Sequence, residues 1–189
     1  MFTGEVKCSQ VMYDEIKRLG GNAIMWKTGH SLIKSKMKET GAVLAGEMSG
    51  HMFFADRYFG YDDAIYATCR LVEIFSRQRL KKKWFRFSKL LSDLPKTYST
   101  PEIRIDCPDE EKFRVVDRLS NIIGQGEENI GVREIIKIDG IRIIFENGWG
   151  LIRGSNTQAV LVLRFEATTQ EELIWIKKFI EESLSKVCS

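Results

Sequence analysis

The sequence predicts an α/β domain with a mixed sheet, followed by a smaller α+β domain. Before Pro95, short apolar runs alternate with segments whose apolar residues recur at helical spacing, which is typical of an α/β layer. After Pro101, a strand and a helix are followed by several strands and a last helix, which is typical of an α+β unit. The polar stretch between these prolines has the composition of a linker, so we expect domains at 1–97 and 98–189.

Length and composition limit the class of protein. The 189 residues suit one large or two small domains, and 43% hydrophobic residues can supply packed cores. With 29 basic and 26 acidic residues the net charge is +3, too small an excess to indicate a nucleic-acid partner by itself. No apolar run approaches the ~20 residues that span a membrane. Four widely spaced cysteines without zinc-ligand spacing fit a reduced, cytoplasmic protein, and we expect no membrane partner.

In the first domain, expected strands alternate with expected helices. The strands are expected at 5–8, 22–26, 42–45 and 52–54, and the helices at 10–19, at 31–40 and after Asp62 or Asp63. The apolar stripes that predict the helices are Val11, Met12, Ile16 and Leu19, then Leu32, Ile33 and Met37, then Ile65, Cys69, Val72 and Phe75. Ligands of such sheets bind at loops beyond the carboxyl ends of strands, so the loops at 27–30 and 46–51 are candidates for one shared rim.

The second domain carries clear turn and cap signals. Strands are expected at 103–105, 134–138, 141–146, 149–153 and 159–167, and helices at 108–123 and after Thr169. Asp139-Gly140 predicts a tight hairpin, and Thr169-Gln170-Glu171-Glu172 forms a capping box. The helical stripes are Phe113, Val116, Leu119 and Ile123, then Leu173, Ile176, Ile180 and Leu184.

The loop at 46–51 carries the first candidate chemistry. It holds a carboxylate, a hydroxyl and an imidazole, from Glu47, Ser49 and His51, between two glycines that let the backbone turn sharply. A carboxylate accepts hydrogen bonds from two neighbouring hydroxyls at once, whereas serine and histidine both donate and accept. The loop therefore indicates recognition of a polyol, with a solvated turn as the alternative.

The loop at 153–157 carries the second group of residues with candidate chemistry. It concentrates a guanidinium, two hydroxyls, an amide side chain and a glycine between two expected strands. Arginine, hydroxyls and the N–H groups of a turn are what a phosphate dianion needs. A polar hairpin turn is the alternative, since Asn and Gly also favour turns.

The segment at 77–87 interleaves basic and aromatic residues. Nucleic-acid binding is one interpretation of that pattern. We favour a solvated helix end that leads to a short helix at 88–94, because the rest of the chain is close to neutral. No nucleic-acid partner is therefore expected.

Four motifs occur in one order: Lys27-Thr28-Gly29-His30-Ser31, the loop at 46–51, Asp62-Asp63 and the loop at 153–157. In this order they resemble the third and fourth domains of α-D-phosphohexomutases of the phosphomannomutase/phosphoglucomutase type. The resemblance covers nearly the whole chain, and the two loops together are far more specific than either alone. It implies a first domain like phosphohexomutase domain 3 and a second domain like the C-terminal domain of that family.

The resemblance also implies roles for the residues. The family interconverts hexose 1-phosphates and 6-phosphates through a hexose bisphosphate, so the expected ligand is a hexose phosphate. The sugar-binding residues implied are Glu47, Ser49, His51, His30 and Lys7. The phosphate-binding residues implied are Arg153, Ser155, Asn156 and Thr157. They would clamp the phosphate that does not react, which positions the substrate for in-line transfer.

The catalytic parts implied by the resemblance lie elsewhere. In the family, a phosphoserine in the first domain donates the phosphoryl group, and an aspartate-rich loop in the second binds Mg²⁺. Neither the threonine-alanine-serine-histidine stretch nor the aspartate-glycine-aspartate-glycine-aspartate loop occurs here. We therefore expect a fragment without catalytic or metal-binding residues that is inactive alone. Its candidate partner is a separate N-terminal half.

Two positions depart from the family pattern. Ala64 replaces a usual glycine and could stiffen the helix start, and Gln158 replaces a usual proline and could loosen the phosphate loop. Three function classes stay open: the substrate half of a mutase, a stand-alone phosphosugar-binding module or remnant, and a nucleic-acid binder.

Overall fold

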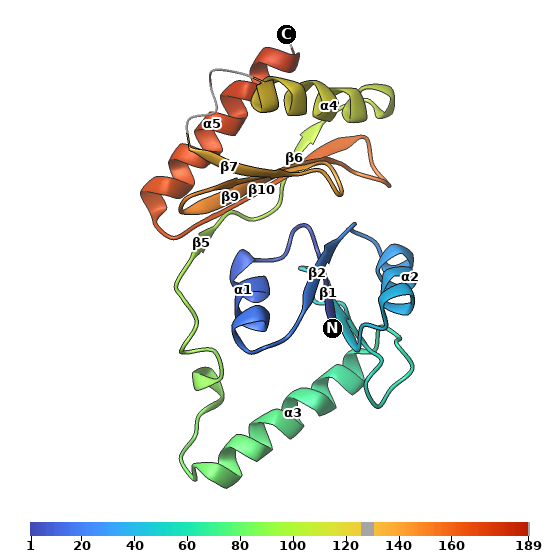
Figure 1. Cartoon of the computed structure of the whole chain (residues 1–189), viewed down its shortest axis with the longest axis vertical. Coiled ribbons are helices and arrows are strands. Elements are labelled where there is room, and N and C mark those ends of the chain that lie inside the picture. Colours follow the sequence, from blue (N-terminus) through green and yellow to red (C-terminus); the bar gives the residue numbers. More distant parts are fainter. Residues whose placement is uncertain (126–130, 189) are drawn as a thin grey trace. The chain divides into compact units, whose positions relative to one another are not determined.

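The computed structural model of the chain describes residues 1–125 and 131–188 (Figure 1). It divides into two compact units, Met1–Pro95 and Lys96–Ser189. The first contains a mixed sheet with helices and the second an antiparallel sheet with helices, so the predicted fold class is confirmed. Within the described ranges, no helix combines the length and the apolar character needed to cross a bilayer.

The first unit is an α/β layer. Its strands are β1 (Phe2–Glu5), β2 (Ala23–Trp26), β3 (Leu44–Gly46) and β4 (Met52–Phe54), in the sheet order β2-β1-β3-β4. β1 is parallel to β2 and β3, while β4 returns antiparallel to β3. The helices α1 (Gln10–Arg18) and α2 (His30–Thr40) cover opposite faces of this sheet, and α3 (Ala64–Lys81) follows β4 (Figure 1).

The helix ends of this unit follow the sequence signals. Ser9 caps α1, because its Oγ accepts a hydrogen bond from the Val11 N–H at 3.2 Å. Gly41 ends α2 in the left-handed conformation, with φ at 66°. Asp63 caps α3 by accepting from the Tyr66 N–H at 2.9 Å, so it is the second aspartate of the pair that acts as the cap.

The core of the first unit is small and differs partly from the predicted stripes. It consists of Ile33, Met37, Ala42, Ala45 and Phe53. Leu19 and Leu32, which we expected inside, are 74% and 39% exposed. Tyr13 is the buried residue of α1 instead, since its hydroxyl donates to the Glu5 carbonyl at 2.8 Å.

The predicted stripe of α3 is wrong. Ile65 and Val72 are 80% and 56% exposed, and no residue of this helix is buried. The side that faces the unit is polar and aromatic: Arg70 lies over the Phe54 ring, and Tyr66 stacks on Tyr58. Apolar spacing alone could not identify this face, because these polar side chains satisfy each other against the loop that precedes the helix.

The second unit places two helices on one face of an antiparallel sheet (Figure 1). Its helices are α4 (Asp109–Gln125) and α5 (Gln170–Cys188). Its strands are β5 (Tyr98–Ser99), β6 (Ile103–Asp106), β7 (Val132–Ile136), β8 (Ile141–Phe145), β9 (Gly148–Gly154) and β10 (Val160–Ala167). The sheet order is β5-β10-β9-β8-β7, and β6 also pairs with β10.

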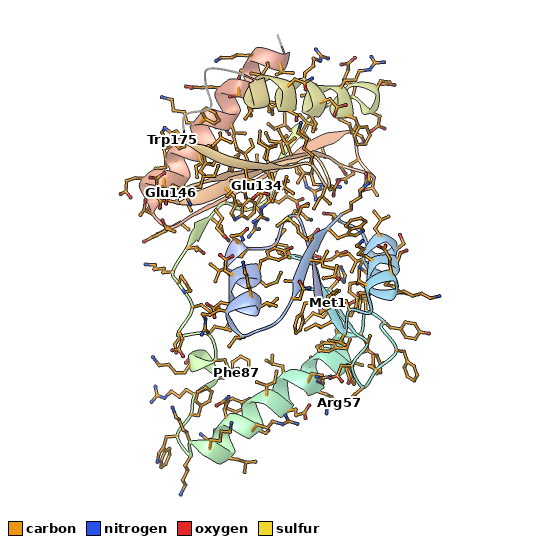
Figure 2. The ribbon with its side chains drawn as sticks, in the orientation of Figure 1. Met1, Arg57, Phe87, Glu134, Glu146 and Trp175 are labelled. Atoms are coloured by element: carbon orange, nitrogen blue, oxygen red, sulfur yellow. The ribbon has the colours of Figure 1, made fainter. Side chains whose placement is uncertain are left out.

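A large core fills the space between this sheet and its helices (Figure 2). Ile176 and Ile180 of α5 and Leu119 of α4 have no exposed surface, and they pack with Phe165 and Ile143 of the sheet. The predicted stripes of both helices are therefore largely confirmed, although Phe113 is 52% exposed.

Two local predictions in the middle of the chain differ from the structure. The expected helix at 88–94 is a single 3₁₀ turn, Phe87–Lys89. Part of the polar stretch between Pro95 and Pro101 forms β5, which pairs with the C-terminal end of β10. A short edge strand tolerates flanking prolines, because their missing N–H groups do not interrupt the inner ladder.

Candidate functional site

The loop at 46–51 is a tight hairpin between β3 and β4. The Glu47 N–H donates to the His51 carbonyl at 2.9 Å, and the Gly50 N–H donates to the Glu47 carbonyl at 3.0 Å. Gly50 has φ at 93°, a conformation that disfavours residues with a Cβ. The turn thus presents the side chains of residues 47–49 on a short, closed loop.

A buried carboxylate anchors this hairpin to β1. Glu5 has no exposed surface, and its Oε1 accepts a hydrogen bond from the Met48 N–H at 2.9 Å. The Lys7 ammonium lies 3.6 Å from the same oxygen. Glu5 therefore links the end of β1 to the tip of the loop and gives Lys7 a partner within the unit.

One oxygen of the Glu47 carboxylate accepts a hydrogen bond, and the other does not. The Ser49 hydroxyl donates to Glu47 Oε2 at 3.2 Å. Glu47 Oε1 is buried, and no donor in the described ranges reaches it. A buried acceptor without a donor is unfavourable by about 1–3 kcal/mol, so a rotation of the carboxylate that offers this oxygen to a ligand hydroxyl would relieve that cost.

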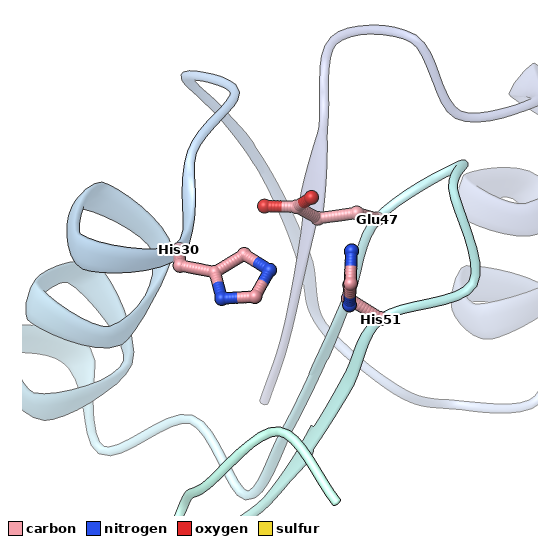
Figure 3. A group of neighbouring side chains, drawn as sticks. All are labelled: His30, Glu47 and His51. Carbon is pink, nitrogen blue, oxygen red and sulfur yellow. The ribbon is translucent and has the colours of Figure 1, made fainter. Parts of the chain in front are cut away.

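The two histidines meet beside Glu47, and Asp62 links them. His51 Nδ1 lies 2.6 Å from Asp62 Oδ2, and His30 Nε2 lies 3.8 Å from the same oxygen. The imidazole rings are in edge contact, with centroids 4.3 Å apart. Figure 3 shows both rings and the Glu47 carboxylate pointing toward a common space.

The structure brings most of the predicted sugar-binding residues together. Glu47, His30 and His51 converge, with Ser49 bonded to Glu47. Lys7 instead forms an ion pair with Glu5, the carboxylate that anchors the loop.

Sequence reasoning missed the structural roles of Glu5 and Asp62. A signal existed for Asp62: only one residue of the Asp62-Asp63 pair can cap α3, which leaves the other for a different partner. No comparable signal marks Glu5, whose role depends on a backbone group far along the chain.

One group of side chains in the described part of the chain has the composition and spacing of metal ligands. It comprises His30, Glu47 and His51, with one ligand atom from each within 4.8 Å of the others. Two imidazoles do not fit Mg²⁺, which prefers oxygen ligands and bound water. The Mg²⁺ implied by the resemblance therefore finds no suitable ligand set in this group.

In the second unit, Arg153 of the predicted phosphate loop is paired with a carboxylate. Arg153 lies in β9 and is 5% exposed. Its Nε donates to Asp139 Oδ2 at 2.9 Å, and its Nη2 donates to Oδ1 at 3.4 Å. Asp139 stands in the β7–β8 hairpin, where Gly140 has φ at 76° and a Cβ would come within 2.3 Å of the Ile152 carbonyl. The predicted Asp-Gly hairpin thus places a carboxylate against the arginine.

The rest of the loop is a compact turn with an exposed tip. The Ser155 hydroxyl oxygen accepts from the N–H groups of Thr157 and Gln158 at 3.3 and 3.2 Å. Ser155 is buried, whereas Asn156 and Thr157 are exposed. The loop therefore gathers Arg153 and Ser155 at its base and leaves two polar side chains at its tip.

Gln158 is tied to its surroundings, contrary to the looser loop we expected. Its side-chain oxygen accepts from Arg104 at 2.7 Å, and its carbonyl accepts from the buried ammonium of Lys112 at 3.0 Å. Lys112 is a cation beside the loop that the sequence did not reveal as such. Its helical position among charged residues is typical of a solvated face.

Comparison with protein families matches both units. A family described as "Phosphoglucomutase/phosphomannomutase, alpha/beta/alpha domain III" matches residues 1–98. The C-terminal domain of phosphoglucomutase/phosphomannomutase matches residues 102–183.

Individual relatives agree with these matches. A phosphomannomutase/phosphoglucomutase of Pseudomonas putida is 48% identical over 183 residues, which are 97% of this chain and 37% of that protein. A phosphoglucomutase of Neisseria meningitidis serogroup A is 49% identical over 167 residues, or 88% of this chain and 34% of that protein. The crystal structure of a phosphoglucomutase/phosphomannomutase family protein from Burkholderia thailandensis is similar with a TM-score of 0.85 and 40% identity, over 98% of this chain and 37% of that one. The chain thus spans little more than a third of the length of these relatives.

Proposed function

Because this chain belongs to the phosphoglucomutase/phosphomannomutase family, we propose that it is the substrate-binding C-terminal part of a hexose-phosphate mutase. It matches domains III and IV of that family. The relatives named above are mutases of hexose phosphates by name, and this chain corresponds to about a third of each. The proposed ligand is a hexose phosphate, and the proposed polypeptide partner carries the remaining domains.

The observation that carries the proposal is the state of the Glu47 carboxylate. One oxygen accepts from Ser49, and the other is buried without a donor in the described part of the chain. Two adjacent sugar hydroxyls can donate to one carboxylate, and the Ser49 hydroxyl can accept in turn. His30 and His51 add ring N–H groups or lone pairs beside it.

In the second unit, the proposed role is to bind a phosphate group. Two of the five N–H donors of Arg153 are used by Asp139. The other guanidinium donors, the Ser155 O–H and the side chains of Asn156 and Thr157 would contribute the remaining contacts. The positive charge of Arg153 favours a dianion, although Asp139 reduces that attraction.

Binding tests the proposal directly. Saturation-transfer NMR with mannose 1-phosphate should show binding on the order of millimolar. Glu47→Gln should weaken it about tenfold or more, because a hydrogen bond to a charged group contributes about 1.5–3 kcal/mol. Glu39→Gln is the matched control, since Glu39 is an exposed carboxylate of the same unit that pairs only with Lys36 among the described residues. Equal affinity of the wild type and Glu47→Gln would contradict the proposal.

Turnover should be absent from the chain alone. It has neither of the two catalytic motifs that the resemblance implies, and the described groups do not fit Mg²⁺, so no phosphoryl-transfer step is assigned to these residues. A coupled assay with mannose 1-phosphate, a hexose bisphosphate and Mg²⁺ should stay at background. Adding separately expressed domains I and II of the Pseudomonas putida relative should raise it. Turnover that scales with this chain alone, and is lost in Glu47→Ala, would overturn this expectation.

A further inference from the structure

The meeting point of His30, Glu47 and His51 has a property that sugar recognition does not require. Each of the three residues contributes a ligand atom within 4.8 Å of the other two. They come from the start of α2, from the hairpin loop and from the residue before β4, so they converge from different directions (Figure 3). Two imidazoles and one carboxylate are a common ligand set of zinc sites that keep one position open.

A carboxylate behind the cluster sets the orientation of one imidazole. His51 Nδ1 is 2.6 Å from Asp62 Oδ2, so the ring donates its Nδ1–H to Asp62 and keeps the Nε2 lone pair for a ligand. Asp62 is itself fixed, because its other oxygen accepts from the Met52 N–H at 3.2 Å. Metal-binding histidines characteristically donate their second ring N–H to a carboxylate in this way.

Glu47 supplies an oxygen that lacks a partner. Its Oε1 is buried, with no hydrogen-bond donor in the described ranges, while Ser49 holds Oε2. Glu47 and Asp62 together provide two carboxylates, which balance the charge of a dication. The cluster therefore has an unused lone pair on an imidazole, an unused carboxylate oxygen and a negative charge that balances a dication.

The three ligand atoms must move slightly closer together to bind a cation. Zinc–ligand bonds of about 2.0–2.2 Å place the ligand atoms of a tetrahedral site about 3.3–3.6 Å apart, so the side chains must approach by about 1 Å. The side chains of His30 and His51 are 47% and 44% exposed, so a cation can reach both from solvent, while His30 packs edge-on against the core ring of Phe53 and His51 is held by Asp62. Imidazole ligands favour Zn²⁺ and related transition-metal ions over Mg²⁺.

We propose that His30, Glu47 and His51 form a binding site for a zinc-class divalent cation, with Asp62 as the positioning residue for His51. The site stands on this geometry and does not depend on the mutase role. Because Glu47 belongs to both sites, the cation and sugar hydroxyls compete for it. Zn²⁺ would therefore exclude the sugar from the first unit.

Spectroscopic titration of the 189-residue chain with Co²⁺ tests the site. We expect d–d absorption that is typical of a low-coordinate complex, without thiolate-to-cobalt charge transfer. This absorption should saturate at one equivalent of Co²⁺, and Zn²⁺ should abolish it. His30→Ala and His51→Ala should remove the absorption, and Asp62→Asn should weaken binding about 10–100-fold. Glu39→Gln, a carboxylate outside the cluster, should bind Co²⁺ as the wild type does. Absorption that survives both histidine variants, or displacement of Co²⁺ by equimolar Mg²⁺, would overturn the proposal.

A second measurement needs no substitution. The chain has only two histidines, so its imidazole proton signals are few and assignable. One equivalent of Zn²⁺ should shift the signals of both rings together, and a shift in neither or in only one ring would overturn the three-residue site. Mannose 1-phosphate binding measured in the presence of EDTA tests the sugar role separately, so failure of either idea leaves the other intact.

Discussion

The two units support their candidate loops in different ways. In the second unit, the loop at 153–157 joins strands of seven and eight residues that are backed by a large apolar core. In the first, the loop at 46–51 joins strands of three residues above a core of five side chains. The short hairpin is held instead by Glu5, which binds its backbone, and by Asp62, which binds His51. Packing positions one loop, whereas two carboxylates, the buried Glu5 and the partly exposed Asp62, position the other.

A core substitution in the second unit is expected to have the largest effect. Ile180 has no exposed surface, and Ile180→Ala should lower the free energy of unfolding by about 2–5 kcal/mol, because it removes buried methylenes and leaves a cavity. Ile65→Ala, at an 80% exposed position of α3, should change it by less than about 0.5 kcal/mol. Urea unfolding of both variants measures the difference. Equal losses would show that α3 is buried against something in solution.

Removing the anchor of the first loop should have the next largest effect. Glu5→Ala deletes the acceptor of the Met48 N–H and should destabilise the first unit by about 1–3 kcal/mol. The hairpin should open more often, so amide hydrogen exchange at residues 48 and 50 should accelerate while β9 and β10 keep their protection. Unchanged exchange at residue 48 would contradict the role of Glu5 as the anchor.

Breaking the ion pair between Arg153 and Asp139 in the second unit is expected to strengthen phosphate binding. Asp139→Asn keeps the shape of the side chain but removes the carboxylate that competes for Arg153. We expect inorganic phosphate to bind several-fold more tightly, since Arg153 then lacks its internal counter-ion. Glu182→Gln is the control, because its carboxylate lies on α5, is 63% exposed and pairs with Lys178. Weaker phosphate binding in Asp139→Asn would show that Asp139 holds Arg153 in its binding orientation.

The smallest effect is expected at the start of α3 and depends on pH. Hydrogen bonds from the Tyr58 hydroxyl, at 2.5 Å, and from the Tyr66 N–H lower the pKa of Asp63 below its ordinary value of 3.8. A lowered folded-state pKa stabilises the fold above that ordinary value, and this contribution disappears as the pH falls through the folded-state pKa. In Asp63→Asn, the free energy of unfolding should therefore decrease less steeply as the pH falls through the acid range. An unchanged decrease in that range, measured by circular dichroism, would contradict the assignment.

Much of the fold was predictable from local sequence signals. Gly50 and the Asp139-Gly140 pair predicted the two hairpins, and Ser9 and Asp63 predicted helix starts, because each signal acts within a few residues. The apolar stripe of α5 was also correct, since this long helix lies on a continuous sheet. The stripe of α3 misled, because its inward face is formed by Tyr66 and Arg70.

The candidate site was predictable only in its residue types. The sequence indicated Glu47, Ser49 and His51 because one short loop carries all three. It could not indicate Glu5 or Asp139, since each acts on a group that only the folded sheet brings near. The metal-ligand geometry was equally hidden, because His30 and His51 have no zinc-ligand spacing in the sequence.

Residue-resolved NMR titration tests the proposed division of roles most directly. Inorganic phosphate at millimolar concentration should shift the amides of residues 154–157 and leave residues 47–50 unchanged. Arg153→Ala should abolish those shifts. Mannose 1-phosphate should in addition shift residues 47–50, and Glu47→Gln should remove that second set, while residues 154–157 still shift at a higher concentration. If mannose 1-phosphate saturates the shifts at 154–157 while residues 47–50 do not move, the first loop does not bind the sugar and its proposed role is wrong.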